Sequence, residues 1–176
     1  MFYRQYLKFL RRYVFPAGIA LFLLITVYVI VEAQPNLKFP WDAPDKWYFT
    51  QGPHKWGSLA GSGIDFAPGP KSAVLSSSVG DVNFAGWTSW KCADGSSPAN
   101  LNVRINHGSG WETWYLHLGS TSWGTPGTIS PSISVGQGEY VGEAASTGCS
   151  TGKHIHLELV VNGNHENWDG KTAPVG

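Results

Sequence analysis

The stretch Lys153-His154-Ile155-His156-Leu157-Glu158-Leu159 alternates polar and apolar side chains. Side chains two positions apart in a strand point to the same face, so His154 and His156 are expected to project side by side. The apolar residues between them then face the opposite side of a sheet. Two imidazoles held together on a rigid strand suit metal binding, proton transfer or both, whereas a lone His is more often a surface or core residue.

Three further residues, His54, Asp65 and His117, turn this pair into a candidate zinc hydrolase site. A catalytic zinc typically has three protein ligands and an open position for water, whose pKa it lowers from about 15.7 towards about 7. The sequence lacks an H-E-x-x-H motif, which excludes the helical zincin arrangement. Four His and one Asp can supply three ligands and leave two residues for acid–base chemistry.

The rest of the chain consists of short strand-like runs separated by glycine turns. Gly108-Ser109-Gly110 predicts a hairpin turn, and Asn162-Gly163 predicts a type I′ turn. We therefore predict a mostly β fold, an antiparallel sheet with few helices whose long loops form a groove. The predicted strands are residues 63–67, 73–76, 80–86, 101–106, 111–118, 140–142 and 155–161.

The amino-terminal segment has the properties of one transmembrane helix. Tyr13 to Val31 contains 19 residues without a charge, which as a helix would span roughly 28 Å, close to the ~30 Å core of a bilayer. The preceding basic residues, with no acid before Glu32, orient residues 1–12 towards the cytoplasm and the rest of the chain outside. Cleavage after Ala33, as in a signal peptide, is the alternative, and it also exports the domain.

The chain is thus predicted to have four parts. Residues 1–12 form a cytoplasmic basic segment, 13–31 a transmembrane anchor or signal segment, 32–45 a Pro-containing linker and 46–176 the metal-binding domain. From Gln34 onward there are 8 Lys/Arg and 11 Asp/Glu, a net charge of −3. A nucleic-acid partner is therefore not expected.

Six segments, taken in order, resemble the lysostaphin-type zinc endopeptidases, a family that includes the beta-lytic proteases. Together they cover most of the chain from Gln51 to Val160. Any one of them alone would be weak evidence, but their joint order is highly specific. The segments are residues 51–54, 63–67, 78–86, 103–110, 113–118 and 146–156.

This resemblance implies roles for the five candidate residues. His54, Asp65 and His156 correspond to the zinc ligands, and His117 and His154 correspond to the catalytic histidines. It also implies a Zn2+ endopeptidase that hydrolyses peptide bonds of bacterial peptidoglycan, in cross-bridges or stem peptides and often beside glycine. Such an enzyme would be a monomer in the cell envelope, with its catalytic domain outside the cytoplasmic membrane.

Ten residues separate His54 from Asp65, more than in lysostaphin itself. This longer insertion is similar to the beta-lytic branch and predicts a Gly-rich loop, with Gly57, Gly61 and Gly63, at the rim of the cleft. His107 also falls in a family motif, but its Asn-His-Gly setting predicts a structural role at a hairpin and not a role as a ligand.

Cys92 and Cys149 are the only cysteines, and in an exported domain such a pair predicts a disulfide, with free thiols as the alternative.

Two other function classes remain open. A catalytically inactive relative that binds the wall or activates a hydrolase should have lost ligands, yet all five positions are filled. A D-alanyl-D-alanine carboxypeptidase with a related zinc site would place an acidic residue a few positions ahead of its last His ligand, where Thr151, Gly152 and Lys153 stand here.

Overall fold

The computed structural model describes residues 34–56 and 59–166. The predicted cytoplasmic segment 1–12 and transmembrane segment 13–31 lie outside the described residues. Within the described ranges, no helix is both long and apolar enough to span a membrane. The described part of the chain falls in one compact unit that begins at Gln34.

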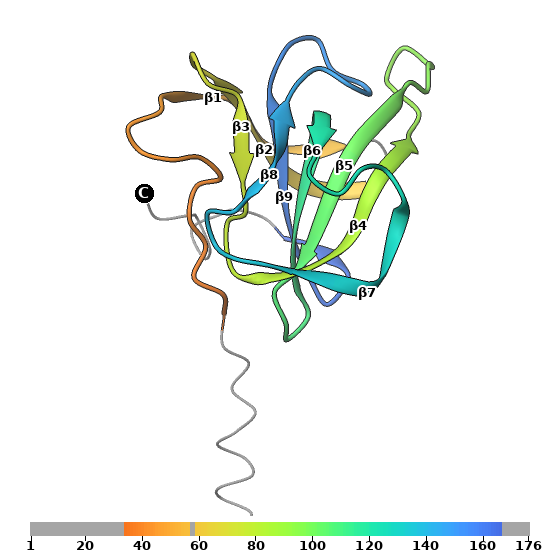
Figure 1. The fold of residues 1–176 in the computed structure, drawn as a ribbon. Coiled ribbons are helices and arrows are strands. Elements are labelled where there is room, and N and C mark those ends of the chain that lie inside the picture. The colour runs from red at the N-terminus through yellow and green to blue at the C-terminus, as the bar shows by residue number, and fades with distance from the viewer. Residues whose placement is uncertain (1–33, 57–58, 167–176) are drawn as a thin grey trace, which may run out of the picture. The chain divides into compact units, whose positions relative to one another are not determined.

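A ten-stranded sheet dominates this unit, and every strand pairing in it is antiparallel (Figure 1). The strands follow the order β1-β2-β9-β6-β5-β4-β7, while β10 pairs with β9, and β8 pairs with β3 and β6. This arrangement confirms the predicted mostly β, antiparallel fold. The strands are β1 (Trp47–Trp56), β2 (Leu59–Pro68), β3 (Ala73–Leu75), β4 (Gly80–Ser89), β5 (Ala99–Asn106), β6 (Trp111–Thr121), β7 (Gly127–Val135), β8 (Tyr140–Ala144), β9 (Ile155–Val161) and β10 (Asn164–His165).

Strand β9 carries the sequence from which the fold was predicted, and it lies at the centre of the sheet. It pairs with β2 on one side and β6 on the other. Residues 155–160 are all buried, so both faces of β9 are covered. The alternation of polar and apolar residues therefore separates a polar buried face from an apolar core, and not an exposed face from a buried one.

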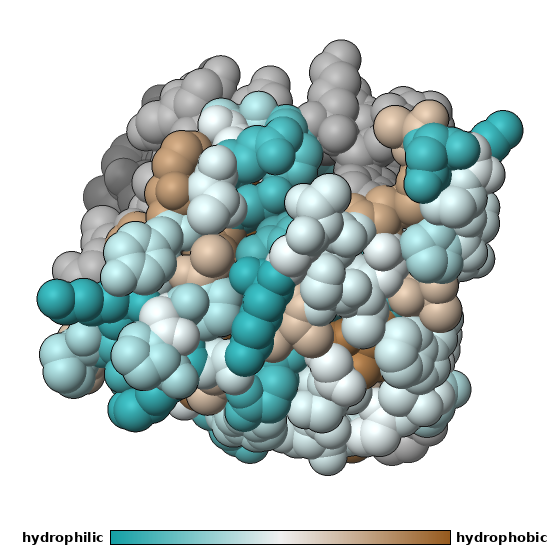
Figure 2. Space-filling model, turned by 90° about the horizontal axis from the view of Figure 1, so that it is seen from above, coloured by the Kyte–Doolittle hydropathy of each residue, from teal (hydrophilic) through white to brown (hydrophobic). Residues whose placement is uncertain are grey.

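The apolar core gathers side chains from most of the strands. Residues such as Val103, Leu118 and Leu157 are fully shielded from solvent. The end of the molecule seen from above is by contrast largely hydrophilic, with small scattered apolar patches (Figure 2). Whether the loops at this end form the predicted groove stays a prediction.

Both predicted turns adopt left-handed backbone conformations. Gly108, Ser109 and Gly110 have φ values of 84°, 49° and 79° and connect β5 to β6. Asn162 and Gly163 have φ values of 51° and 77°, the positive pair that a type I′ turn requires, between β9 and β10. These turns fix which strands become neighbours of β9 and β6.

Gly61 and Gly63 lie in strand β2 and not in the Gly-rich loop that we predicted between His54 and Asp65, whereas Gly57 lies outside the described residues. Strands β1 and β2 continue into this insertion as a hairpin, with His54 opposite Gly63 and Trp56 opposite Leu59. Backbone pairing thus extends to Trp56 and Leu59. A two-stranded ribbon satisfies N–H and C=O groups that a long loop would leave unpaired.

The segment predicted as a linker is also part of the folded unit. Leu37 is buried in the core, the N–H of Lys38 donates to the carbonyl of Ser77, and Pro40 accepts from the N–H of Leu75. Trp41 stacks on Trp47 with ring centroids 5.1 Å apart. We call residues 34–45 the amino-terminal strap. The compact unit therefore includes residues that precede the boundary predicted at residue 46, because the apolar side chains of the strap pack against the core although the segment contains prolines.

Candidate metal centre

Four neighbouring strands each deliver one of the predicted site residues. His54 lies on β1, Asp65 on β2, His156 on β9 and His117 on β6. The sheet register places Asp65 directly opposite His156, and His156 directly opposite Leu116, the neighbour of His117. The strand order β1-β2-β9-β6 therefore assembles residues that are up to 102 positions apart in the sequence.

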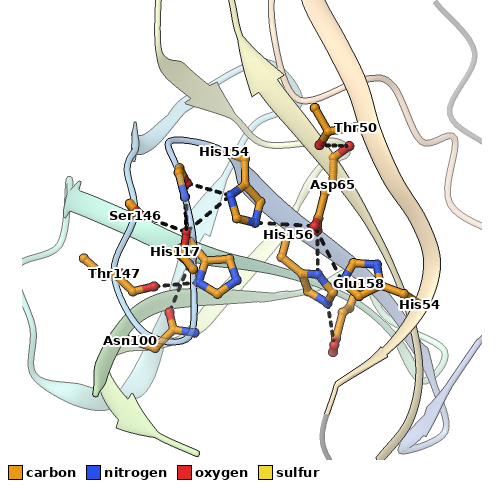
Figure 3. Close-up of polar contacts among 12 residues, drawn as sticks. Thr50, His54, Asp65, Asn100, His117, Ser146, Thr147, His154, His156 and Glu158 are labelled. Atoms are coloured by element: carbon orange, nitrogen blue, oxygen red, sulfur yellow. Dashed lines mark hydrogen bonds and ion pairs between the residues drawn. The ribbon is translucent and has the colours of Figure 1, made fainter. Parts of the chain in front are cut away.

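His54, Asp65 and His156 form a cluster that could hold a metal ion, with one ligand atom from each residue and all three atoms within 4.8 Å of one another. Nδ1 of His156 lies 2.8 Å from Oδ1 of Asp65, and Nε2 of His54 lies 3.5 Å from its Oδ2 (Figure 3). Two imidazole nitrogens and one carboxylate oxygen are a donor set that suits zinc. The residues present therefore fit the metal that the sequence predicts.

Gly63 makes room for this cluster. A Cβ atom built at this position would lie 1.9 Å from Nε2 of His156, which no side chain could tolerate. The absence of a side chain lets the backbone of β2 pass directly over the imidazole ring. Gly63 thus serves the site through close packing within a strand, and not through loop flexibility.

The carboxylates of Asp65 and Glu158 control the charge of His156. Burial opposes the charged form of His156, but hydrogen bonds to Asp65 and Glu158 outweigh it and raise its pKa to about 9. Burial would raise the pKa of Asp65, yet the hydrogen bond and charge of His156 lower it overall. Burial lowers the pKa of His54. Without a metal, the ligand side already stabilises a cation, here the imidazolium of His156.

His117 is held in a different way, by neutral groups. Its backbone is left-handed, with φ of 65°, and its N–H donates to Oδ1 of Asn100 at 3.0 Å. Its ring Nδ1 lies 2.6 Å from the carbonyl oxygen of Thr147 and must donate to it, so Nδ1 carries the proton. Burial lowers the pKa of His117 to about 4, so the ring is neutral at pH 7.

His154 lies between these two groups. An isolated bridge pairs it with Ala145 just before β9 begins, and its Nδ1 lies 2.8 Å from the carbonyl oxygen of Gly152. Its Nε2 lies 3.5 Å from Oδ2 of Asp65, and its ring centroid is 4.7 Å from that of His117. The structure thus brings together all five residues that the sequence singled out (Figure 3).

The sequence interpretation missed three residues around the site: Asn100, Thr147 and Glu158. Asn100 and Thr147 orient His117, but they lie in a strand and a loop without a distinctive motif. Glu158 was recognisable in principle, because a residue two positions after His156 shares its face of the strand. His107 lies elsewhere, 2.8 Å from both the Val79 carbonyl and Thr113 Oγ1, in agreement with the structural role predicted for it.

Cys92 and Cys149 form the predicted disulfide, with Cα atoms 5.6 Å apart. Cys149 lies two residues after Thr147, in the loop that leads to His154. The disulfide therefore ties the loop between β4 and β5 to the loop that contains His154 and whose Thr147 carbonyl accepts a hydrogen bond from His117.

Residues 60–168 match peptidase family M23, which is more than half of the chain. The chain belongs to peptidase family M23. This membership confirms the resemblance to lysostaphin-type endopeptidases, and it places the five clustered residues in a family of metal-dependent peptidases.

Curated M23 relatives resemble the chain over part of their length. The DD-carboxypeptidase/endopeptidase Mpg of Neisseria meningitidis serogroup B is 35% identical over 106 residues, which are 60% of this chain and 21% of the relative. Glycyl-glycine endopeptidase ALE-1 of Staphylococcus capitis is 27% identical over 137 residues, which are 77% of this chain and 34% of the relative. The chain thus spans about a fifth to a third of these relatives.

The fold is also found among solved M23 structures. A zinc containing peptidase from Vibrio cholerae superposes with a TM-score of 0.56 and 23% identity, over 80% of this chain and 41% of that one. At this level of identity the likeness shows the M23 fold alone.

Proposed function

We propose that this protein is a zinc metalloendopeptidase that hydrolyses peptide bonds of bacterial peptidoglycan. The observation that supports it most directly is the cluster of His54, Asp65 and His156, flanked by His117 and His154, in an M23 peptidase. Peptidoglycan as the substrate is supported by the names of relatives, which include a peptidoglycan DD-endopeptidase and a glycyl-glycine endopeptidase.

His54, Asp65 and His156 would hold the zinc ion. When bound, zinc supplies Lewis-acid polarisation of water and of the scissile carbonyl. The three strands that carry these residues are hydrogen-bonded neighbours, so the sheet sets the spacing of their backbones. Oγ1 of Thr50 donates to the backbone carbonyl of Asp65 at 3.2 Å and further restricts it.

His117 has the properties of a general base. Its proton resides on Nδ1, hydrogen-bonded to Thr147, so Nε2 retains the lone pair that can accept a proton from water. Its depressed pKa of about 4 keeps that lone pair available at neutral pH. A left-handed backbone at a buried His is sparsely populated, and such strain is often found where a side chain must be aimed precisely at a substrate.

His154 is placed to donate. Its Nδ1 faces the carbonyl of Gly152, which turns Nε2 towards the cluster. Since Nδ1–H donates to that carbonyl, only the doubly protonated ring carries a second N–H, on Nε2, and this N–H could stabilise negative charge on the substrate carbonyl oxygen during attack. We therefore assign His117 to the water and His154 to the developing oxyanion.

The activity is tested by incubating the full chain, purified in detergent and loaded with zinc, with defined muropeptides and analysing the products by mass spectrometry. We expect new amino termini at one type of peptide bond, with a chelator abolishing the cleavage. Loss of a terminal D-alanine alone would instead indicate a carboxypeptidase. Binding to the wall without cleavage would overturn the proposal in favour of a non-catalytic relative.

We further propose that the protein is anchored in the cytoplasmic membrane with this unit outside. The support is the 19-residue uncharged segment preceded by basic residues. An export-dependent reporter fused after Gly176 should be active, and high salt should not extract the protein from membranes. A mature amino terminus at Gln34 would contradict the anchor but not export, and a reporter active only in the cytoplasm would contradict both.

A further inference from the structure

Glu158 lies directly behind the metal cluster, although no motif pointed to it. It follows His156 by two residues on β9, and its side chain is almost completely buried. Its Oε1 lies 2.9 Å from Nε2 of His156, the ring nitrogen opposite the one that faces Asp65 (Figure 3). His156 is therefore held from both sides by carboxylates.

A buried carboxylate is unfavourable unless it is paired, so its position requires an explanation. The second carboxylate oxygen of Glu158 lies 2.8 Å from Nδ1 of His165, within ion-pair distance. His165 belongs to β10, where it pairs with Val160 across the type I′ turn. Its ring packs edge-on against Trp114, with centroids 5.0 Å apart.

Only one of the two ring nitrogens of His156 can serve as a ligand, and the proton must then reside on the other. A carboxylate oxygen accepts and cannot donate, so Glu158 fixes the proton on Nε2 and leaves the Nδ1 lone pair directed at the cluster. Outer partners of this kind orient the ring and increase its basicity as a ligand.

We propose that Glu158 is a positioning residue for the metal, which holds His156 in its Nε2–H tautomer and thereby increases zinc affinity, with His165 and the β9–β10 hairpin keeping Glu158 in place. This inference rests on the proposed function, because it assumes that His156 binds zinc through Nδ1. It adds a fourth residue on which metal binding depends.

Zinc affinity, measured by competition with a chromophoric chelator, tests the proposal. The variants are Glu158→Ala and Glu158→Gln, with Glu112→Gln as the matched control. Glu112 is a half-buried glutamate on β6, the strand next to β9, and accepts a hydrogen bond from Nε1 of Trp114, but no hydrogen bond or ion pair among the described residues joins it to the metal cluster. We expect about 10–100-fold weaker zinc binding for Glu158→Ala, a smaller loss for Glu158→Gln and no change for Glu112→Gln.

A second readout separates positioning from general destabilisation. In the zinc-loaded protein, 15N-edited NMR of the histidine rings should show a slowly exchanging Nε2–H for His156, which is lost in Glu158→Ala and kept in Glu112→Gln. Equal zinc affinity in wild type and both Glu158 variants would overturn the inference. Equal weakening in the Glu158 and Glu112 variants would overturn it too, since it would reflect general destabilisation. If the wild type itself binds no zinc, it is the proposed function that fails.

Discussion

The site has a ligand half, with His54, Asp65 and His156, and a catalytic half, with His117 and His154. The two halves place a buried histidine in opposite electrostatic surroundings. His156 lies between two carboxylates, and its pKa is raised to about 9. His117 is held by an amide and a backbone carbonyl, and its pKa is lowered to about 4. Both rings are almost completely buried, with 0% and 1% of the residue exposed, so burial cannot explain the difference.

The charge of the hydrogen-bond partner therefore decides what each of these two buried histidines can do. Carboxylate partners favour a cation at His156, whether a proton or a metal ion. Neutral partners orient His117 without stabilising its charged form, which leaves it neutral at pH 7. The two histidines lie on adjacent strands, β9 and β6, yet they are suited to different tasks.

Removing His156 should have the largest effect. We expect His156→Ala to lose zinc and activity together, because only two of the three protein ligands remain. Metal content by atomic emission and cleavage of muropeptides measure the two losses. A His156→Ala protein that kept stoichiometric zinc would show that the ligand half is wrongly assigned.

On the other half, His117→Ala and His154→Ala should keep zinc but lose about 10²–10⁴-fold in turnover, since general acid–base groups contribute that much. The measurement is kcat on one muropeptide at saturating zinc, with metal content as the control. Turnover within threefold of the wild type would remove the affected residue from the mechanism.

The disulfide should support the catalytic half more than the ligand half, because Cys149 lies in the loop that provides Thr147. Replacing both Cys92 and Cys149 with Ser should lower the free energy of unfolding by roughly 4 kcal/mol in the chain-entropy model. We expect several-fold lower turnover with unchanged zinc stoichiometry. Urea denaturation and metal analysis check both, and loss of zinc in a folded protein would show that the halves are not independent.

The smallest predicted effect is a pH dependence of stability in the metal-free protein. The folded pKa of His117, about 4, lies below its unfolded value of about 6.5, so its contribution to stability is lost as the pH falls through this window. The pKa of His156 is raised to about 9, so its contribution is complete below about 6.5 and is lost as the pH rises towards 9.

Between pH 6.5 and 5, the wild type should therefore lose about 2 kcal/mol that His117→Asn does not lose, at about 1.4 kcal/mol per pH unit. Urea denaturation at the two pH values measures this difference. An equal loss in the free energy of unfolding for the two proteins between these pH values would contradict a lowered pKa of His117.

The strand pattern was sufficient to predict the centre of the sheet but not its edges. We missed the two-residue strand β10 and the longer strands β1 and β7, and the two longer ones are the ends of the strand order. Each contains a proline, Pro53 or Pro131, and each has irregular pairing. Proline breaks a strand pattern in sequence, yet an edge strand tolerates it because one side needs no ladder hydrogen bond.

The candidate site could be predicted only as far as its motifs extended. The H-x-H pair indicated two adjacent imidazoles, His54, Asp65 and His117 completed the candidate zinc site, and the family resemblance divided the five residues into ligands and catalytic histidines. Asn100 and Thr147 could not be found, because a side-chain or carbonyl contact across 17 or 30 residues leaves no periodic trace. The roles of the five residues stay predictions until the variants are measured.

Strand β1 has a practical consequence for recombinant work. The family match begins at residue 60, after β1 and after the amino-terminal strap. A gene fragment cut at that limit would encode a protein without His54, without the edge partner of β2 and without Leu37 in the core. The shortest expression product expected to retain both the metal cluster and the packed core starts at Gln34, and grafting the centre onto another scaffold would require β1 as well.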